Sequence, residues 1–244
     1  TADLTSERLV NFDMDASPDA MTLMVTWLGK PVNNVQLLYS SRSIDGGATW
    51  SPASLVSPAR SFAEQPRIDM TSDGQRAVIA YMIRDGAQQE QLSAYARSTS
   101  DGGQTWSVAR KLSLIGHKAD TLSVSLADTS SAGWLMWGEN FNGKYQVLGV
   151  RSDDSGRTWT GARAIASGRF AGFPEVQLSS DGSLGIAAWL EADADTEQTF
   201  IMASRLDSAA QSWSAPVEIS AGHGFDGLPW TTNLIGLSAS TSAL

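Results

Sequence analysis

Three copies of one eight-residue motif constrain this chain more than any other feature of its sequence. Every copy has Ser or Thr at its first position, Asp at the third, Gly at the fifth and Thr-Trp at the end. The three copies are Ser43–Trp50, Thr99–Trp106 and Ser152–Trp159. A degenerate fourth copy ends at Trp213 and has Ser208 and Ala210 in place of Asp and Gly. The four tryptophans are 56, 53 and 54 residues apart, and one fixed turn per unit of that length indicates a repeat array.

A second marker with the same period divides each unit into short strands. One apolar run in every unit has an aromatic residue at or near its end. The four runs are Met21–Trp27, Arg76–Met82, Gly133–Trp137 and Leu184–Trp189. Elsewhere apolar and polar residues alternate with period two, as in Arg67–Thr71, and turn residues interrupt every segment. This pattern is typical of β-strands, so each unit is predicted to form four short antiparallel strands.

Repeated four-stranded sheets predict an all-β chain with the fold of a β-propeller. A sheet with two apolar faces buries both when it packs between neighbours, and blades arranged around an axis achieve this. The predicted units span residues 9–57, 62–113, 118–167 and 172–220, with a partial fifth at 225–244, in one array over 1–244. A β-helix is the alternative architecture, but its coils are shorter than this period. Because the fifth unit is incomplete, we expect a piece of a larger ring of about 5–7 blades.

Composition argues against several classes of function. The chain of 244 residues carries a formal net charge of −9, whereas nucleic-acid binding requires a basic surface. It has no cysteine, which excludes disulfides and thiolate metal sites. Its two histidines, His117 and His223, lack the spacing of metal ligands, and no apolar run reaches the length of a membrane span. We therefore expect no metal, no cofactor, no nucleic-acid partner and no membrane-spanning segment.

The motif resembles the Asp-box, also called the BNR repeat, and the chain resembles sialidases (neuraminidases) and related propellers. This resemblance covers the repeated framework over most of the chain. It implies that each box occupies the turn between the third and fourth strands, on the rim away from the substrate. It also implies a glycan-binding or glycoside-hydrolysing module that is secreted or at the cell surface. The residues that match the box are Ser43, Asp45, Gly47, Trp50, Thr99, Asp101, Gly103, Trp106, Ser152, Asp154, Gly156, Trp159 and Trp213.

These box residues are predicted to have a structural role. The Asp side chain is suited to accept hydrogen bonds from backbone N–H groups of its own turn, and Gly adopts backbone angles that other residues avoid. The Trp supplies a large apolar side chain between sheets. A catalytic or Ca²⁺-binding role for the Asp residues is the alternative. It is disfavoured because identical turns on separate blades point in different directions and do not converge on one ligand.

The candidate ligand-binding residues lie at the start of the predicted innermost strand of each unit. Alignment of the apolar alternation places five residues at equivalent positions: Asp13, Arg67, Ser123, Glu175 and Trp230. Their side chains differ although the surrounding sequence repeats, as expected for a site added to a repetitive scaffold. Arg67 is suited to bind a carboxylate, Asp13 and Glu175 to form an acid/base pair, and Trp230 to stack on a sugar. Solvated charges along an axial channel are the alternative interpretation.

Two functions follow as hypotheses. The first is a sialidase-like module that binds or hydrolyses glycans, with a carbohydrate or glycoconjugate as its partner. The second is a non-catalytic propeller for adhesion or scaffolding, with a protein as its partner. The arginine triad and Tyr nucleophile of sialidases are not identifiable here, because the stretch Leu9–Asp13 lacks the family's Arg. The tyrosines Tyr39, Tyr81, Tyr95 and Tyr145 are predicted to be packing residues. Whether the chain is an enzyme stays open at this point.

Overall fold

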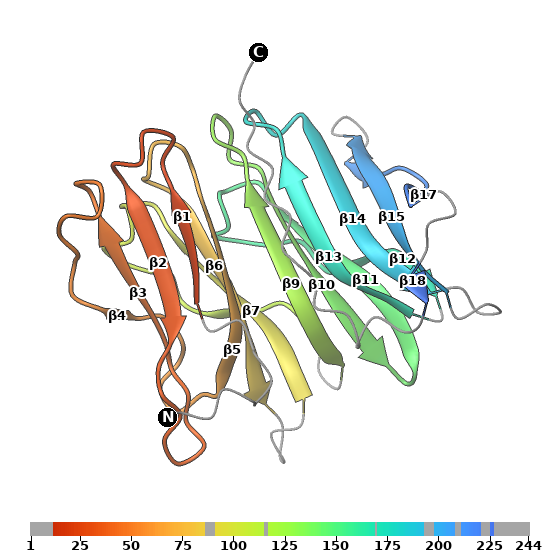
Figure 1. The fold of residues 1–244 in the computed structure, drawn as a ribbon, viewed down its shortest axis with the longest axis horizontal. Coiled ribbons are helices and arrows are strands. Elements are labelled where there is room, and N and C mark those ends of the chain that lie inside the picture. The colour runs from red at the N-terminus through yellow and green to blue at the C-terminus, as the bar shows by residue number, and fades with distance from the viewer. Residues whose placement is uncertain are drawn as a thin grey trace.

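The computed structural model describes residues 12–85, 91–114, 117–168, 170–192, 198–207, 211–220 and 225–226. Over these residues the chain consists of β-strands and their connections, without a helix, so the described ranges hold no helix suited to crossing a membrane. Four antiparallel sheets stand side by side in chain order (Figure 1). The predicted all-β class and the four-stranded antiparallel units are confirmed.

Each sheet forms one blade, and its strands follow one another in chain order. Blade 1 contains β1 (Phe12–Ala16), β2 (Leu23–Leu28), β3 (Leu38–Ser43) and β4 (Ser54–Leu55). Blade 2 contains β5 (Ala63–Met70), β6 (Ala77–Asp85), β7 (Gln91–Thr99) and β8 (Arg110–Lys111). Blade 3 contains β9 (Lys118–Leu126), β10 (Gly133–Phe141), β11 (Lys144–Ser152) and β12 (Arg163–Gly168). Blade 4 contains β13 (Phe170–Leu178), β14 (Leu184–Ala192) and β15 (Gln198–Asp207), and three short strands share its outer position: β16 (Ser212–Trp213), β17 (Val217–Glu218) and β18 (Phe225–Asp226).

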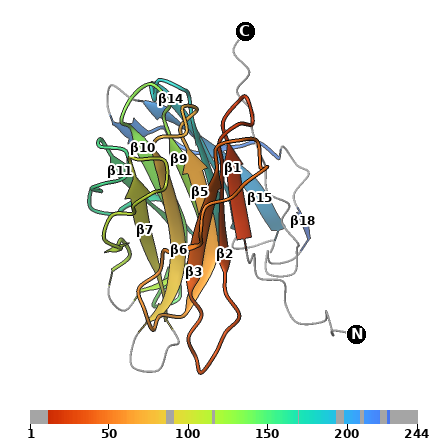
Figure 2. The same ribbon diagram turned by 90° about the vertical axis from the view of Figure 1, so that its left-hand side faces the viewer.

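The first strands of successive blades lie next to one another. β1 contacts β5, β5 contacts β9, and β9 contacts β13, and two views at right angles show the blades stacked side by side (Figures 1 and 2). This arrangement of twisted antiparallel sheets is that of a β-propeller. The predicted fifth unit lies mostly outside the described residues. Its first two residues, Phe225–Asp226, pair with β15 at the outer edge of blade 4.

Three apolar layers, one between each pair of successive blades, hold the array together. We call them seams 1/2, 2/3 and 3/4. In each seam, the tryptophan that closes the motif of the later blade packs against buried residues of the earlier blade. These tryptophans are Trp106 in seam 1/2, Trp159 in seam 2/3 and Trp213 in seam 3/4. The repeated Trp is therefore the side chain that joins one blade to the preceding one.

The three motif copies form the same hydrogen-bonded turn between the third and fourth strands of their blades. Asp45 Oδ1 accepts a hydrogen bond from the Thr49 N–H at 2.9 Å, and Asp45 Oδ2 accepts one from Thr49 Oγ1 at 2.5 Å. Asp101 and Asp154 make the same pair of bonds in their own turns. Gly47 has a φ of +87°, in the left-handed region that favours glycine. Each Asp therefore closes its own turn, and the closed turn positions the Trp that follows it.

Candidate functional site

Four of the five sequence-predicted site residues occupy the same register position in their blades. Each pairs across the sheet with the residue that immediately precedes the aromatic residue of the second strand. The pairs are Asp13 with Thr26, Arg67 with Ala80, Ser123 with Met136, and Glu175 with Ala188. The fifth residue, Trp230, lies outside the described residues. The equivalence inferred from the sequence therefore holds in space for these four positions.

Two of these residues, Asp13 and Ser123, bind the backbone of the next blade. The Ile68 N–H donates to Asp13 Oδ2 at 2.9 Å, and the Val176 N–H donates to Ser123 Oγ at 3.1 Å. The first strand of each blade is a sheet edge, so its outward N–H groups need acceptors from elsewhere. Further bonds of the same kind run from Met70 to Asp15, from Leu126 to Asp69 and from Leu178 to Ser125. We call this set of side-chain to backbone bonds the inner ladder.

Arg67 and Glu175 occupy the same position, but Arg67 makes no hydrogen bond to the backbone of blade 3 within the described ranges, and no blade after that of Glu175 is described. A guanidinium has no acceptor, so Arg67 leaves a gap in the inner ladder between blades 2 and 3. Its side-chain hydrogen bond goes to the Pro66 carbonyl at 3.1 Å. Glu175 Oε2 accepts a bond from Ser123 Oγ at 3.0 Å. In the described part of the chain, Asp13 and Ser123 are therefore the two of these four side chains that bind the backbone of a following blade.

The charges of this group act on one another around the inner edge of the array. Burial raises the pKa of the Asp13 carboxyl, and the Ile68 N–H and the positive charge of Arg67 oppose the rise. Burial also raises the pKa of Glu175, which Arg67 lowers and Asp13 raises further. The positive charge of Arg67 therefore lowers the pKa of both carboxyl groups, although they belong to blades 1 and 4. The structure brings the predicted acid/base pair and the predicted anion-binding Arg into one electrostatic cluster.

A β-bulge lies two residues before three of the equivalent positions. The pairing of the first and second strands shifts register there in blades 2, 3 and 4. The bulged residues have positive φ: +49° for Gln65, +37° for Thr121 and +54° for Phe173. Bulges bend a strand and re-aim its side chains, often beside active sites. These bulges are not predicted from the sequence; the signal available for two of them is the proline that follows Gln65 and Phe173, because proline within a sheet is confined to edges and bulges.

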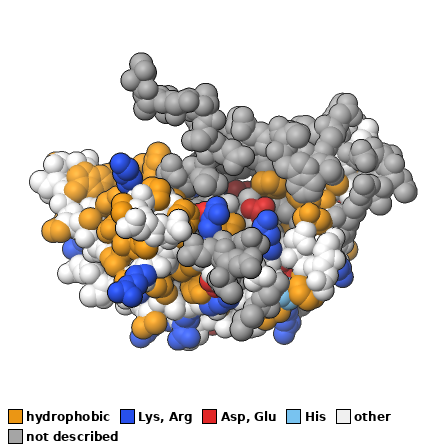
Figure 3. Space-filling model, turned by 90° about the horizontal axis from the view of Figure 1, so that it is seen from below, with side chains coloured by type: hydrophobic (Ala, Val, Ile, Leu, Met, Phe, Trp, Pro, Cys, Tyr) orange, Lys and Arg blue, Asp and Glu red, His pale blue; other side chains and the backbone are white. Residues whose placement is uncertain are grey.

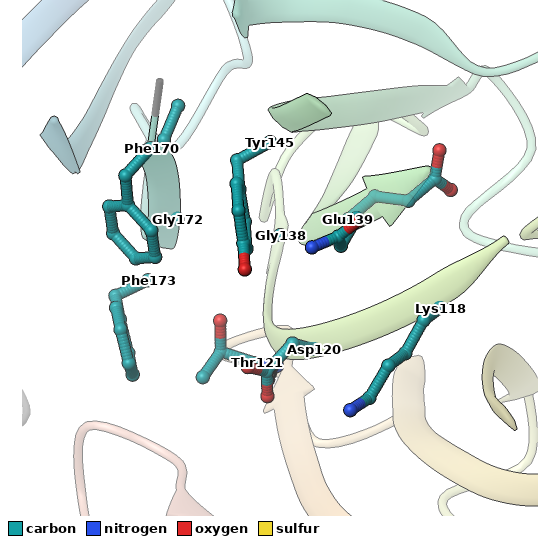
Figure 4. Close-up of a pocket in the computed structure, with 11 residues that line it drawn as sticks. Lys118, Asp120, Thr121, Gly138, Glu139, Tyr145, Phe170, Gly172 and Phe173 are labelled. Carbon is teal, nitrogen blue, oxygen red and sulfur yellow. Dashed lines mark hydrogen bonds between the residues drawn. The ribbon is translucent and has the colours of Figure 1, made fainter. Parts of the chain in front are cut away.

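A cavity of about 160 Å³ opens between blades 3 and 4 beside two of these bulges. One side of it is aromatic: the ring centroids of Tyr145 and Phe170 are 5.3 Å apart, and those of Phe170 and Phe173 are 6.2 Å apart. Lys118 and Asp120 from the start of β9 supply polar groups across from this wall (Figure 4). Tyr145, predicted only as a packing residue, therefore lines the cavity. The volume suits one sugar ring rather than a larger ligand.

The buried carboxylate of Glu139 borders the cavity and is already hydrogen bonded within the protein. It accepts bonds from Trp137 Nε1 at 3.2 Å and Gln146 Nε2 at 3.0 Å, and His117 Nδ1 lies 2.5 Å from Glu139 Oε1. In blade 4, Glu191 Oε2 accepts the corresponding hydrogen bond from Trp189 Nε1 at 3.1 Å. Burial of a carboxyl group costs little free energy when its oxygens accept hydrogen bonds from the protein. Glu139 is therefore a positioning group, which supports the cavity wall.

The cavity and the motif turns lie at opposite ends of the blades. Tyr145, at the start of β11, lines the cavity, whereas Ser152, at the end of β11, opens the third motif copy. A view of the cavity end shows acidic, basic and hydrophobic side chains mixed near its centre (Figure 3). Within the described ranges, no group of three His, Asp or Glu side chains is placed to hold a metal ion. The cavity end thus offers polar and aromatic groups for a ligand.

Comparisons with known proteins support the fold. No family model matches the chain, and no curated protein sequence matches it. Among solved structures, the GH93 α-L-arabinofuranosidase of Fusarium graminearum in complex with arabinobiose is similar at 13% identity and a TM-score of 0.52, over 85% of this chain and 64% of that one. The α-L-arabinanase of Penicillium chrysogenum complexed with arabinobiose is similar at 11% identity and a TM-score of 0.50, over 83% of this chain and 63% of that one. A PL25 ulvan lyase is similar at 12% identity and a TM-score of 0.58, over 85% of this chain and 54% of that one.

The chain spans less than two thirds of the length of each of these three proteins. At identities of 11–13% the likeness is one of fold alone. It agrees with the blade architecture derived above, and it identifies the chain as a β-propeller array built from four-stranded antiparallel blades.

Proposed function

We propose that the chain is a glycan-binding propeller module of the Asp-box, sialidase-like kind, and that it acts at the end of the blades opposite the motif turns. The observation that carries the proposal is the gap in the inner ladder. At one repeated position, Asp13 and Ser123 bind the backbone of the next blade, whereas the described side-chain bond of Arg67 goes to the Pro66 carbonyl and that of Glu175 comes from Ser123. The aromatic cavity lies on the same strand as Glu175, because Phe173 is two residues before it.

The chemistry of these groups suits a sugar. Phe173 and Tyr145 offer flat apolar rings on which a sugar ring stacks, and Asp120 and Lys118 offer groups that hydrogen bond to hydroxyls. The Arg67 guanidinium is a fork that matches a carboxylate or a pair of hydroxyl oxygens. A carboxyl whose pKa is raised by burial, such as that of Glu175, is suited to proton donation. Stacking would fix the ring, and the two charged groups would contact its substituents.

The similar structures support this ligand class. The arabinofuranosidase and the arabinanase were solved with arabinobiose, and the ulvan lyase is a polysaccharide lyase. These proteins share the blade architecture of this chain, and a propeller presents its ligands near the axis. We also propose export from the cell as the setting of this module, as its resemblance to Asp-box sialidases implies.

Replacement of Arg67 by Ala is expected to weaken glycan binding about tenfold or more, because a charged hydrogen bond contributes about 1.5–3 kcal/mol. Replacement of Phe173 by Ala is expected to weaken it about fivefold through loss of a stacking surface. Affinity gel electrophoresis with arabinan, ulvan and a sialylated glycoprotein would measure both, followed by calorimetry on the glycan that binds. The same samples, incubated with aryl glycosides that include a sialoside, would test for turnover.

Val108→Ala is the matched control. Val108 is 81% exposed and lies between the motif and β8 of blade 2, away from the cavity, so this variant should bind like the parent chain. Absence of binding to every glycan in the panel by the parent chain would refute the proposal. Equal binding by the parent, Arg67→Ala and Phe173→Ala would refute the site and leave glycan binding elsewhere on the surface.

A second candidate function, a non-catalytic scaffold, is favoured by the inner ladder itself. Hydrolysis of a glycosidic bond usually requires a pair of carboxyl groups. Asp13, the predicted partner of Glu175, already accepts the Ile68 N–H with one oxygen. Binding without turnover in the glycoside assay, for a parent chain that binds glycans, would support a lectin-like role. Binding of a protein partner without any glycan would support the scaffold.

A further inference from the structure

Seams 2/3 and 3/4 differ at the end of the blades that carries the cavity. In blade 2, Glu64 on β5 pairs across the sheet with Met82 on β6, which is fully buried in seam 2/3. Glu64 is 1% exposed and forms an ion pair with Arg84, two residues after Met82. The Arg84 guanidinium also lies over the Phe62 ring, 5.2 Å from its centroid. Blade 2 therefore closes its buried carboxylate with a cation of its own.

The three equivalent positions of blade 3 hold Asp120, Gly138 and Asn140, and all three line the cavity. Asp120 pairs with Gly138, and in both blades the partner of the acid directly follows the aromatic residue of the second strand, which fixes the equivalence. Asn140 stands where blade 2 has Arg84, and its Oδ1 accepts the Gly143 N–H at 3.1 Å. Blade 3 thus keeps the acid and lacks the cation that would close it.

Gly138 provides the room for the cavity. A Cβ on Gly138 would lie 3.2 Å from the Asp120 carbonyl oxygen and 3.4 Å from Gly172 Cα in blade 4. A side chain as large as that of Met82 would have no space there unless the two blades separated. The exchange of a large apolar residue for Gly therefore distinguishes seam 3/4 from seam 2/3 at this end.

The bulge at Thr121 directs Asp120 toward blade 4. Asp120 pairs with Gly138 and Ser123 pairs with Met136. These partners are two residues apart on β10, so Asp120 and Ser123 lie on the same face of their sheet, and Ser123 accepts a hydrogen bond from the backbone of blade 4. Without the bulge, Asp120 would lie on the opposite face.

The Asp120 carboxylate keeps an acceptor for a ligand. Among the described residues it has one hydrogen bond, from the Thr121 N–H to Oδ1 at 2.9 Å, and no ion pair. A carboxylate accepts hydrogen bonds and donates none, so Oδ2 is suited to groups that donate, such as sugar hydroxyls. A carboxylate on the ligand would be repelled at this distance.

The two cations nearest to this site do little to attract an anionic ligand. Lys118 lines the cavity with an exposed side chain, and an ion pair with an exposed ammonium contributes little free energy. The positive charge of Arg67 already lowers the pKa of two carboxyl groups of the protein, those of Asp13 and Glu175. The charge of Arg67 is thus balanced within the inner edge of the array.

We propose that Asp120 makes this site selective for neutral sugars, whose hydroxyl groups donate to Oδ2 while the ring stacks on the aromatic wall of the cavity (Figure 4). This inference rests on the proposed glycan-binding function and adds the class of glycan. The same register position serves two purposes in neighbouring blades. In blade 2 the acid is consumed by an internal ion pair, and in blade 3 it is an acceptor that faces the cavity.

Affinity gel electrophoresis of the intact chain tests the selectivity. Arabinan and galactan serve as neutral probes, and polygalacturonate, in which a galactose-type ring carries a carboxylate, serves as the acidic probe. A neutral probe is expected to retard the chain, and polygalacturonate is not. Asp120→Asn keeps an acceptor for the Thr121 N–H and removes the charge, so it should weaken binding of the neutral probe about tenfold.

Asn140→Arg recreates in blade 3 the closing cation of blade 2. The new guanidinium should pair with Asp120 and weaken binding of the neutral probe about tenfold or more. Asn140→Ala is the matched control, because it removes the bond to the Gly143 N–H without adding a charge, and it should bind like the parent chain. Circular dichroism would verify that all three variants fold.

The outcomes separate this inference from the function on which it rests. Retardation of the parent chain by polygalacturonate or a sialylated glycoprotein, without retardation by arabinan or galactan, would overturn the selectivity and leave glycan binding in place. Unchanged binding of the neutral probe by Asp120→Asn or by Asn140→Arg would overturn the role of Asp120. Absence of binding to every probe would refute glycan binding itself, and this inference with it.

Discussion

Replacement of Gly156 by Ala is expected to lower the free energy of unfolding by about 2–5 kcal/mol. Gly156 lies in the third motif turn with a φ of +81°, which costs a residue with a side chain about 1–2 kcal/mol. Its new Cβ would also lie 2.2 Å from Val78 Cγ2. Val78 is fully buried in seam 2/3 and is β-branched, so its side chain has little freedom to move aside. The blades themselves would have to separate.

Gly143→Ala is the matched control because it isolates the backbone cost from the packing cost. Gly143 has a φ of +77° in the tight turn between β10 and β11, and a Cβ there would meet no atom within 4 Å. This variant should lose about 1–2 kcal/mol. Urea denaturation followed by circular dichroism would compare the two. Equal losses for Gly143→Ala and Gly156→Ala would show that the motif glycine serves its turn alone and that close contact between blades is unimportant.

The repeat made the fold predictable from the sequence. Strands of period two, a turn of fixed composition and an aromatic marker recur together, so each unit supports the interpretation of the others. The hydrogen bonds of Asp45 within its own turn are local and follow from residue type. The equivalence of Arg67 and Glu175 was likewise visible in the alternation of apolar residues, because register in a half-buried strand is set by that alternation.

The candidate site was less predictable because its features depend on contacts between blades. Asp13 and Ser123 gave no sign in the sequence that they accept N–H groups from the next blade. The cavity between blades 3 and 4 depends on the bulges at Thr121 and Phe173, which shift register by a single residue. Bulges of this kind follow from the geometry of neighbouring strands. A pattern of residue types along one strand does not reveal them.

Stability is expected to be greatest at mildly acidic pH and to decline on both sides. On the acidic side, hydrogen bonds lower the pKa of Asp45, Asp101 and Asp181 to about 2. These groups contribute stability that is fully present above their unfolded pKa near 3.8 and is lost as the pH falls toward 2. On the alkaline side, burial, followed by nearby carboxylates, raises the pKa of Asp69 to about 8. The folded state then holds a proton that the unfolded chain has released.

The sign of the Asp69 contribution follows from proton binding. Between pH 3.8 and 8 the folded state binds the proton more tightly than the unfolded state, so stability falls as the pH rises through this window. The burial that raises the pKa of Asp13, Asp15 and Glu175 adds to the same decline. The loss from Asp69 is expected to be on the order of 2–4 kcal/mol. Urea denaturation in buffers from pH 3 to pH 9 would measure it.

Asp69→Asn separates this effect from the general repulsion of a chain with a net charge of −9. The amide oxygen of Asn keeps an acceptor for the Leu126 N–H, which donates to Asp69 Oδ2 at 2.6 Å, and Asn does not titrate. The alkaline decline should therefore flatten while the acidic decline remains. Asp181→Asn, at the exposed turn between β13 and β14, should flatten the acidic decline and leave the alkaline decline in place. If the curves of stability against pH for the parent chain and Asp69→Asn run parallel above pH 4, the alkaline decline does not come from the inner ladder. Net repulsion would then explain it, because that repulsion changes little when one carboxyl is removed.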